Sequence, residues 1–112
     1  MVLSSSASFA QGSAQSATAP VLKSCDGASD RQWCEINRAK MQREAPALRS
    51  RDYQAMRNAA FCQWDGCDGS VELNRRSACA WRRLIMQMHY KPGGPADRSD
   101  ESNLGLCVSA GL

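Results

Sequence analysis

Six cysteines are the residues of this sequence with the clearest chemistry, and all of them follow the first twenty positions. An even number of cysteines in a chain of 112 residues is typical of a disulfide framework in an oxidising compartment. A reduced cytosolic protein with small core cysteines is the alternative interpretation. We expect a periplasmic or secreted protein in which all six form disulfides. They are Cys25, Cys34, Cys62, Cys67, Cys79 and Cys107.

The soft metal ligands of the chain have a simpler structural explanation. No Cys-x-x-Cys pair supplies the short spacing that a structural zinc site needs. His89 follows Met86 and Met88, and such a set suits copper. A histidine is also favourable at the C-terminal end of a helix, where it interacts well with the helix dipole. We therefore expect no metal and no cofactor.

Acidic and nucleophilic residues do not form a recognisable catalytic set. Asp65, Asp68 and Glu72 surround a glycine-rich turn, but their spacing differs from that of a calcium-binding EF-hand loop. His89 is the only histidine, so a serine or cysteine nucleophile has few bases to activate it. Nothing distinguishes two of the eleven carboxylates as a hydrolytic pair. We expect no catalytic residues and a protein that is not an enzyme.

Charge and hydropathy restrict the class of partner. The net charge is +3, an excess too small to indicate nucleic acid, and eleven of the fourteen basic residues are arginine. Arg75, Arg76, Arg82 and Arg83 cluster, but a helix would spread them over a solvated surface; a polyanion-binding patch is the alternative. No apolar stretch approaches the eighteen or so residues that span a bilayer. We expect an unknown protein partner, no nucleic acid and no membrane span.

The N-terminal segment differs in composition from the rest. Its first twenty residues carry no charge and are rich in Ser, Ala, Gly and Gln, so they cannot bury enough apolar surface to offset their ordering entropy. Ser8 and Ala10 resemble the end of a secretory signal peptide, with cleavage before Gln11. We predict a disordered tail over 1–21, with a signal-peptide remnant, and one folded domain over 22–112.

Secondary-structure elements must hold the residues considered above in place. The spacing of apolar residues along the chain predicts that these elements are helices. Ser29 and Gln32 form a capping box that begins the first helix, and Pro46 is expected to end or kink it. Asn74 caps the third helix. No convincing strand is present, so the expected fold class is all-α. The other expected helices cover about 52–64, 75–90 and 99–109, with turns at 65–70 and 91–95.

The chain also repeats itself. A shift of 45 residues places Cys34 on Cys79 and Cys62 on Cys107. The same shift matches Met41-Gln42 with Met86-Gln87. Several matches at one offset indicate a duplicated helix-loop-helix unit.

One part of the chain carries the spacing of a known repeat. The matching positions are Ala55, Ala59, Ala60, Gly66, Gly69, Val71, Asn74, Ala78 and Trp81. This stretch resembles a Sel-one-like repeat, a branch of the tetratricopeptide-like helical repeats. Asn74 stands where the family prefers Asp, Gln63 replaces an aromatic residue, and the loop is two residues longer. The resemblance implies antiparallel helical hairpins, about four helices in all, whose faces stack on one another or on a partner.

The duplication also predicts the disulfide pairing. Equivalent cysteines should form equivalent bonds, which gives Cys34 with Cys62 and Cys79 with Cys107. Cys25 then remains for Cys67. The main alternative joins Cys62 with Cys79 inside one hairpin.

Three functional hypotheses follow from these observations. The first is a non-enzymatic protein-interaction or structural module of the cell envelope. The second is a small inhibitor or effector of a cell-wall or extracellular enzyme, with residues 65–70 as its reactive loop. The third is an enzyme acting on cell-wall or extracellular substrates. The binding face and the oligomeric state are not predicted.

Overall fold

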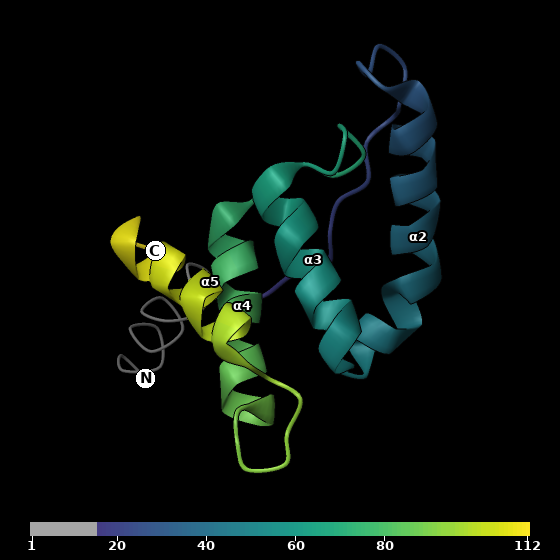
Figure 1. Cartoon of the computed structure of the whole chain (residues 1–112). Coiled ribbons are helices and arrows are strands. Elements are labelled where there is room, and N and C mark those ends of the chain that lie inside the picture. Colours follow the sequence, from purple (N-terminus) through teal and green to yellow (C-terminus); the bar gives the residue numbers. More distant parts are fainter. Residues whose placement is uncertain (1–15) are drawn as a thin grey trace, which may run out of the picture.

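The computed structural model describes residues 16–112, and these residues form four helices joined by loops. The prediction of an all-α fold with about four helices is confirmed. Extended pairing in the described part is limited to one isolated bridge between Leu22 and Val71. The signal-peptide-like residues 8–11 lie outside the described part. The helices are α2 (Arg31–Arg49), α3 (Tyr53–Asp65), α4 (Arg75–His89) and α5 (Arg98–Ser109) (Figure 1).

Each helix begins at a residue whose side chain accepts a hydrogen bond from the first turn, as helix N-caps do. Asn74 caps α4, as predicted, and Asp52 and Asp97 cap α3 and α5. At α2 the prediction is wrong by one residue. Asp30, and not Ser29, accepts the bond from the Trp33 amide at 3.1 Å.

Helix α2 runs through Pro46 instead of ending before it. An interior proline costs a helix about 3 kcal/mol, because it removes one backbone hydrogen bond and crowds the preceding turn. The last turn is nevertheless retained, since it buries Leu48 in the core beside Ala55 and Met56 of α3. Burial of the leucine side chain contributes roughly 1.5–3 kcal/mol and offsets most of that cost.

The antiparallel pair of α3 and α4 is the centre of the fold (Figure 1). Ala60 and Ala78 are buried on these helices, and their small side chains allow a close approach of the two backbones. Trp81 and Ile85 fill the space beside them. Helix α5 packs on α4, whereas α2 stands apart from α4 and contacts α3 (Figure 1).

An N-terminal arm, residues 16–23, passes between α2 and α3 in extended form (Figure 1). The carbonyl oxygen of Thr18 accepts hydrogen bonds from Gln63 Nε2 at 2.9 Å, Trp81 Nε1 at 3.0 Å and Ser77 Oγ at 3.2 Å. The disordered tail predicted over 1–21 is therefore wrong for residues 16–21. The error arises because composition describes side chains alone. Here a main-chain carbonyl of the arm accepts hydrogen bonds from buried donors of α3 and α4.

All six cysteines form disulfides, and the pairing differs in part from the prediction. Cys79 is bonded to Cys107, as the duplication predicts. The two other bonds are local, Cys25 with Cys34 and Cys62 with Cys67, so the expected pairs Cys34 with Cys62 and Cys25 with Cys67 are wrong. The alternative pair, Cys62 with Cys79, is also not formed.

The arm explains this difference. Lys23 N donates to Ser70 O at 2.9 Å, and Glu72 N donates to Val21 O at 2.9 Å. Leu22 then packs against Met41 of α2 and Cys62 of α3. This segment separates the two helices where a bond from Cys34 to Cys62 would have to cross. Among residues 16–112 no such arm intervenes between α4 and α5, where the predicted bond is present.

Candidate functional site

The cysteines do not provide reactive thiols. Among the described residues no cysteine is free, because all six are paired. Cys34, Cys79 and Cys107 are also almost completely buried. Three disulfides in so small a domain indicate an oxidising environment. The cysteines therefore act as covalent restraints on the helices and loops.

The soft ligands considered for copper lie at the C-terminal end of α4. His89 ends α4 and packs edge-on against Tyr53, with ring centroids 5.3 Å apart. Met88 is exposed and Met86 is half-buried. Within residues 16–112 no three histidine, cysteine or acidic side chains are grouped as metal ligands would be. His89 thus serves as a packing residue at a helix end.

The acidic residues of the glycine-rich loop are used locally. Asp65 Oδ2 accepts a hydrogen bond from the Cys67 amide at 3.2 Å. Asp68 Oδ2 accepts one from Asn37 Nδ2 of α2 at 2.9 Å. Both carboxylates are exposed, and they fix the loop and its contact with α2.

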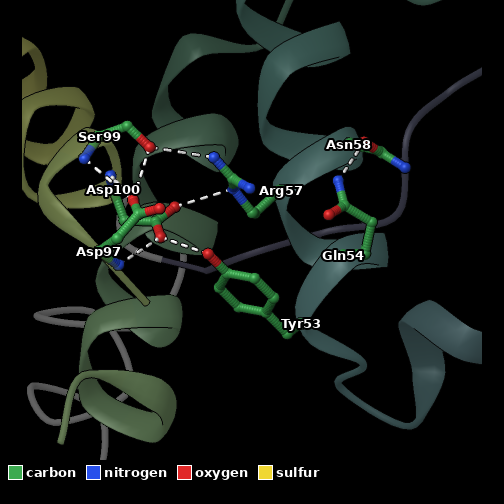
Figure 2. Close-up of polar contacts among 7 residues, drawn as sticks. All are labelled: Tyr53, Gln54, Arg57, Asn58, Asp97, Ser99 and Asp100. Atoms are coloured by element: carbon green, nitrogen blue, oxygen red, sulfur yellow. Dashed lines mark hydrogen bonds and ion pairs between the residues drawn. The ribbon is translucent and has the colours of Figure 1, made fainter. Parts of the chain in front are cut away.

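A buried carboxylate is the centre of a polar cluster that joins α3 to α5 (Figure 2). Asp100, on the first turn of α5, is only 1% exposed. Its Oδ2 accepts hydrogen bonds from the Tyr53 hydroxyl at 2.5 Å and from the Asp97 amide at 3.0 Å. Its Oδ1 lies 3.0 Å from Arg57 Nε, an ion pair without hydrogen-bond alignment. Ser99 completes the cluster by accepting a bond from Arg57 at 3.1 Å.

The electrostatics of this cluster favour a structural role. Burial and the hydrogen bond to Asp100 raise the pKa of Tyr53 to about 12, so the phenol remains a donor at neutral pH. Burial lowers the pKa of Arg82, an effect that nearby Asp100 opposes. The carboxylate is thus shared among groups of the protein itself, and α3 is fastened to α5. The sequence signal that could have identified this cluster is the capping box of Asp97 and Asp100, because the first helical turn is where such pairs lie.

A cavity of about 390 Å³ lies among the arm, α2 and α3. This volume is within the range of small-molecule binding sites, roughly 300–1,000 Å³. Most of its wall is apolar, including Leu22, Met41, Ala45, Leu48, Ala59 and Trp81. The cavity could not be expected from the sequence, because one of its walls is the arm that composition assigned to a disordered tail.

Two arginines lie on the wall of this cavity at the C-terminal end of α2. Arg51 holds its guanidinium over Trp81, 5.2 Å from the ring centroid. Arg49 belongs to the last turn of α2. Glu44 also lines the cavity, and its carboxylate accepts hydrogen bonds from Asn58 Nδ2 at 3.0 Å. The formal charge of the wall is therefore positive.

The outer surface of α2 carries a second feature, the α2 stripe, defined as Trp33, Ile36, Lys40 and Arg43. The spacing of three, four and three residues places these side chains on one face of the helix. Trp33 is 55% exposed and Ile36 is 44% exposed. Lys40 and Arg43 are exposed as well, and neither forms an ion pair within residues 16–112.

No helix in the described part is both long and apolar enough to cross a bilayer. Comparison with protein families, curated proteins and solved structures finds no match to the chain. The features of the described residues that could bind a partner or a ligand are the cavity, the α2 stripe and the disulfide-restrained loops.

Proposed function

We propose that the chain is a non-enzymatic protein-binding module of the periplasm or the secreted space, and that the α2 stripe contacts its partner. The observation that carries this proposal is the exposure of Trp33 beside Ile36 on one helical face. Tryptophan is enriched among the residues that dominate binding energy at protein interfaces. Single exposed apolar residues are common, but an aromatic and an aliphatic side chain at helical spacing form a contiguous patch.

The chemistry of the stripe defines the kind of partner. Two apolar side chains are followed, one and two turns later, by Lys40 and Arg43. A complementary surface carries an apolar pocket for Trp33 and acidic side chains for the two cations. Complementary charge speeds association and discriminates against basic partners.

The helix that bears the stripe is held rigidly at its N-terminal half. Cys34 is bonded to Cys25 of the preceding loop. Arg38 Nε donates to the Lys23 carbonyl at 2.9 Å, and Asn37 donates to Asp68. A pre-organised helix loses little entropy on binding, so more of the interaction energy appears as affinity.

The packing of α3 against α4 supports the Sel-one-like assignment that forms part of this proposal. Ala60, Ala78 and Trp81 are buried where the family resemblance requires small and aromatic residues. Repeats of this class bind proteins through surfaces that their stacked helices present. The α2 stripe is such a surface on the helix preceding this hairpin.

A matched set of variants tests the proposal. The wild-type protein, the double variant Trp33→Ala/Ile36→Ala and the control Phe61→Ala are immobilised and exposed to a cell-envelope extract. Phe61 is 54% exposed on α3, so its replacement removes a similar apolar area elsewhere. We expect a protein that is retained by the wild type and by Phe61→Ala and lost with the double variant. Equal retention by all three proteins would exclude the stripe as the interface.

A second candidate function has an observation of its own. Residues 65–70 form a loop restrained by the bond between Cys62 and Cys67. Asp65, Asp68 and Gly69 are its exposed residues, and Cys67 and Asp68 adopt positive φ values of 45° and 60°. A rigid loop with a fixed conformation is suited to inhibit an extracellular or cell-wall enzyme. Assays of lysozyme and of a serine protease with and without the protein test this role. Inhibition that Asp68→Ala removes would favour the inhibitor over the α2-stripe proposal.

A further inference from the structure

We propose that the cavity among the arm, α2 and α3 binds a single-chain fatty acid, with its acyl chain inside and its carboxylate at Arg49 and Arg51. This inference is independent of the α2 stripe, which lies on another face of the same helix. It depends on the shape of the cavity, the distribution of charge along it and the fixed position of its walls.

The apolar lining is elongated. On α2 it runs from Met41 through Ala45 to Leu48, two turns of one helical face and about 10 Å of helix axis. Leu22 closes the Met41 end, where both side chains belong to a separate apolar cluster. An unbranched chain of medium length matches an apolar lining of this length better than a compact ring does.

The positive charges lie at the opposite end of the lining. Arg49 follows Leu48 in the last turn of α2, and Arg51 lies two residues further along the chain. Neither forms an ion pair within the described residues. Glu44 lies on the same wall, but it is held by Asn58, and the two arginines exceed it in charge. An apolar cavity with a positive end fits a molecule with an apolar chain and one negative end, because a carboxylate forms strong charge-assisted hydrogen bonds with guanidinium groups.

Arg51 is positioned before any ligand arrives. Its φ of 63° is unusual for a residue other than glycine, and such conformations persist where the surroundings impose them. Its amide donates to the Leu48 carbonyl at 3.0 Å, and its guanidinium lies over Trp81. The head-group end is thus built by the connection between α2 and α3.

The opposite wall is fixed by the arm. The Thr18 carbonyl receives three hydrogen bonds from α3 and α4. Residues 17, 19 and 20 on either side of it line the cavity. A preformed cavity avoids the ordering cost that a collapsing groove would impose on a ligand.

Calorimetric titration with two surfactants of equal chain length tests the proposal. Dodecanoate and dodecyltrimethylammonium, each below its micelle concentration, differ in the sign of the head-group charge. We expect dodecanoate to bind with a dissociation constant at least about tenfold lower than that of the cation. Arg49→Gln/Arg51→Gln should weaken dodecanoate binding by about tenfold and should not weaken binding of the cation. Arg76→Gln is the matched control, because it removes an exposed arginine of α4 that belongs neither to the cavity nor to the α2 stripe, and it should bind dodecanoate like the wild type.

A cavity-filling variant separates this site from surface adsorption. Ala45→Phe places a ring in the cavity, and we expect it to abolish dodecanoate binding while circular dichroism shows an unchanged helix content. Absence of dodecanoate binding to the wild type, equal affinity for the two surfactants, or unchanged binding by Ala45→Phe would each overturn the proposal. A dimer in sedimentation that Ala45→Phe dissociates would assign the cavity to a second copy of the chain instead. The variant Trp33→Ala/Ile36→Ala should retain dodecanoate binding whether or not the α2 stripe binds a protein.

Discussion

Asp100, buried on the first turn of α5, accepts a hydrogen bond at 2.5 Å from the hydroxyl of Tyr53, which lies 47 positions earlier at the start of α3. The same carboxylate forms an ion pair with Arg57, one turn further along α3. A single side chain therefore connects the two helices and also completes the capping box of its own helix, in which Asp97 is the N-cap. The position of α5 depends on this residue and on the bond between Cys79 and Cys107.

Replacing Asp100 with asparagine should destabilise the protein by about 2–4 kcal/mol, since it leaves the cations Arg57 and Arg82 without their buried counter-charge. Arg57 is partly exposed and regains some hydration in the variant. The expected loss of unfolding free energy is therefore smaller than the largest losses caused by breaking a fully buried ion pair. Urea unfolding followed by circular dichroism measures the change. Glu101→Gln removes an exposed neighbouring charge of α5 and is expected to change stability by less than about 0.5 kcal/mol. Equal stability of the two variants would contradict the role assigned to Asp100.

Tyr53 should make the fold sensitive to strongly alkaline solution. Its pKa is raised, chiefly by burial and then by Asp100, from the ordinary value of 10 to about 12 in the folded protein. Folding thus favours the neutral phenol, and this contribution is complete below pH 10 and is lost as the pH rises toward 12. Absorbance titration of tyrosine should show an ionisation near pH 12 that Tyr53→Phe removes and Tyr90→Phe retains. An unchanged titration curve for Tyr53→Phe would refute the assignment.

The sequence predicted the helices because their caps and apolar spacing are local properties. The Asn74 cap and the turn at 65–70 are two such local features. The bond between Cys79 and Cys107 was predicted from the 45-residue repeat instead. The other two disulfides could not be predicted in the same way, because duplicated helices need not keep duplicated surroundings. Within residues 16–112 the arm lies between α2 and α3 and has no counterpart between α4 and α5, and it changes the nearest partners of Cys34 and Cys62. The cavity was not predicted either, because the arm forms one of its walls.

Removing the arm should therefore cost more than removing a disordered tail. A chain that begins at Val21 lacks the Thr18 carbonyl, and the buried donors of Gln63, Ser77 and Trp81 then depend on water. We expect a loss of about 2–4 kcal/mol in unfolding free energy, because each unsatisfied buried donor costs about 1–3 kcal/mol and water replaces part of this. A chain that begins at Ser16 is the control. It keeps the Thr18 carbonyl, and we expect it to be as stable as the wild type. Thermal unfolding of both truncated proteins measures the difference. Equal melting temperatures would show that residues 16–20 do not stabilise the fold.

The three disulfides should contribute unequally. The bond between Cys79 and Cys107 spans 28 residues, whereas that between Cys62 and Cys67 spans five. On the loop-entropy account the long loop contributes about 3–4 kcal/mol and the short one about 2 kcal/mol. Cys79→Ala/Cys107→Ala should thus lower the melting temperature more than Cys62→Ala/Cys67→Ala does.

Peptide mapping without reduction provides the control for these variants. It should recover Cys25 with Cys34, Cys62 with Cys67 and Cys79 with Cys107 from the wild-type protein. Recovery of a peptide that joins Cys34 to Cys62 would instead restore the symmetric scheme of the duplicated unit. Six free thiols in the native protein would refute the disulfide framework and the oxidising environment together.

The connection between α2 and α3 gives the last prediction, because Arg51 has two opposing effects there. Its positive φ costs about 1–2 kcal/mol for a residue with a Cβ atom, whereas its guanidinium gains a contact of about 0.5–1 kcal/mol with Trp81. Arg51→Ala loses the contact and keeps the strain, so it should be less stable than the wild type. Arg51→Gly loses the same contact and relieves the strain, and we expect it to be about 1 kcal/mol more stable than Arg51→Ala. Chemical unfolding of the two variants under the same conditions isolates the backbone effect, because both lack the guanidinium. A glycine variant no more stable than the alanine variant would show that the turn does not impose this conformation on residue 51.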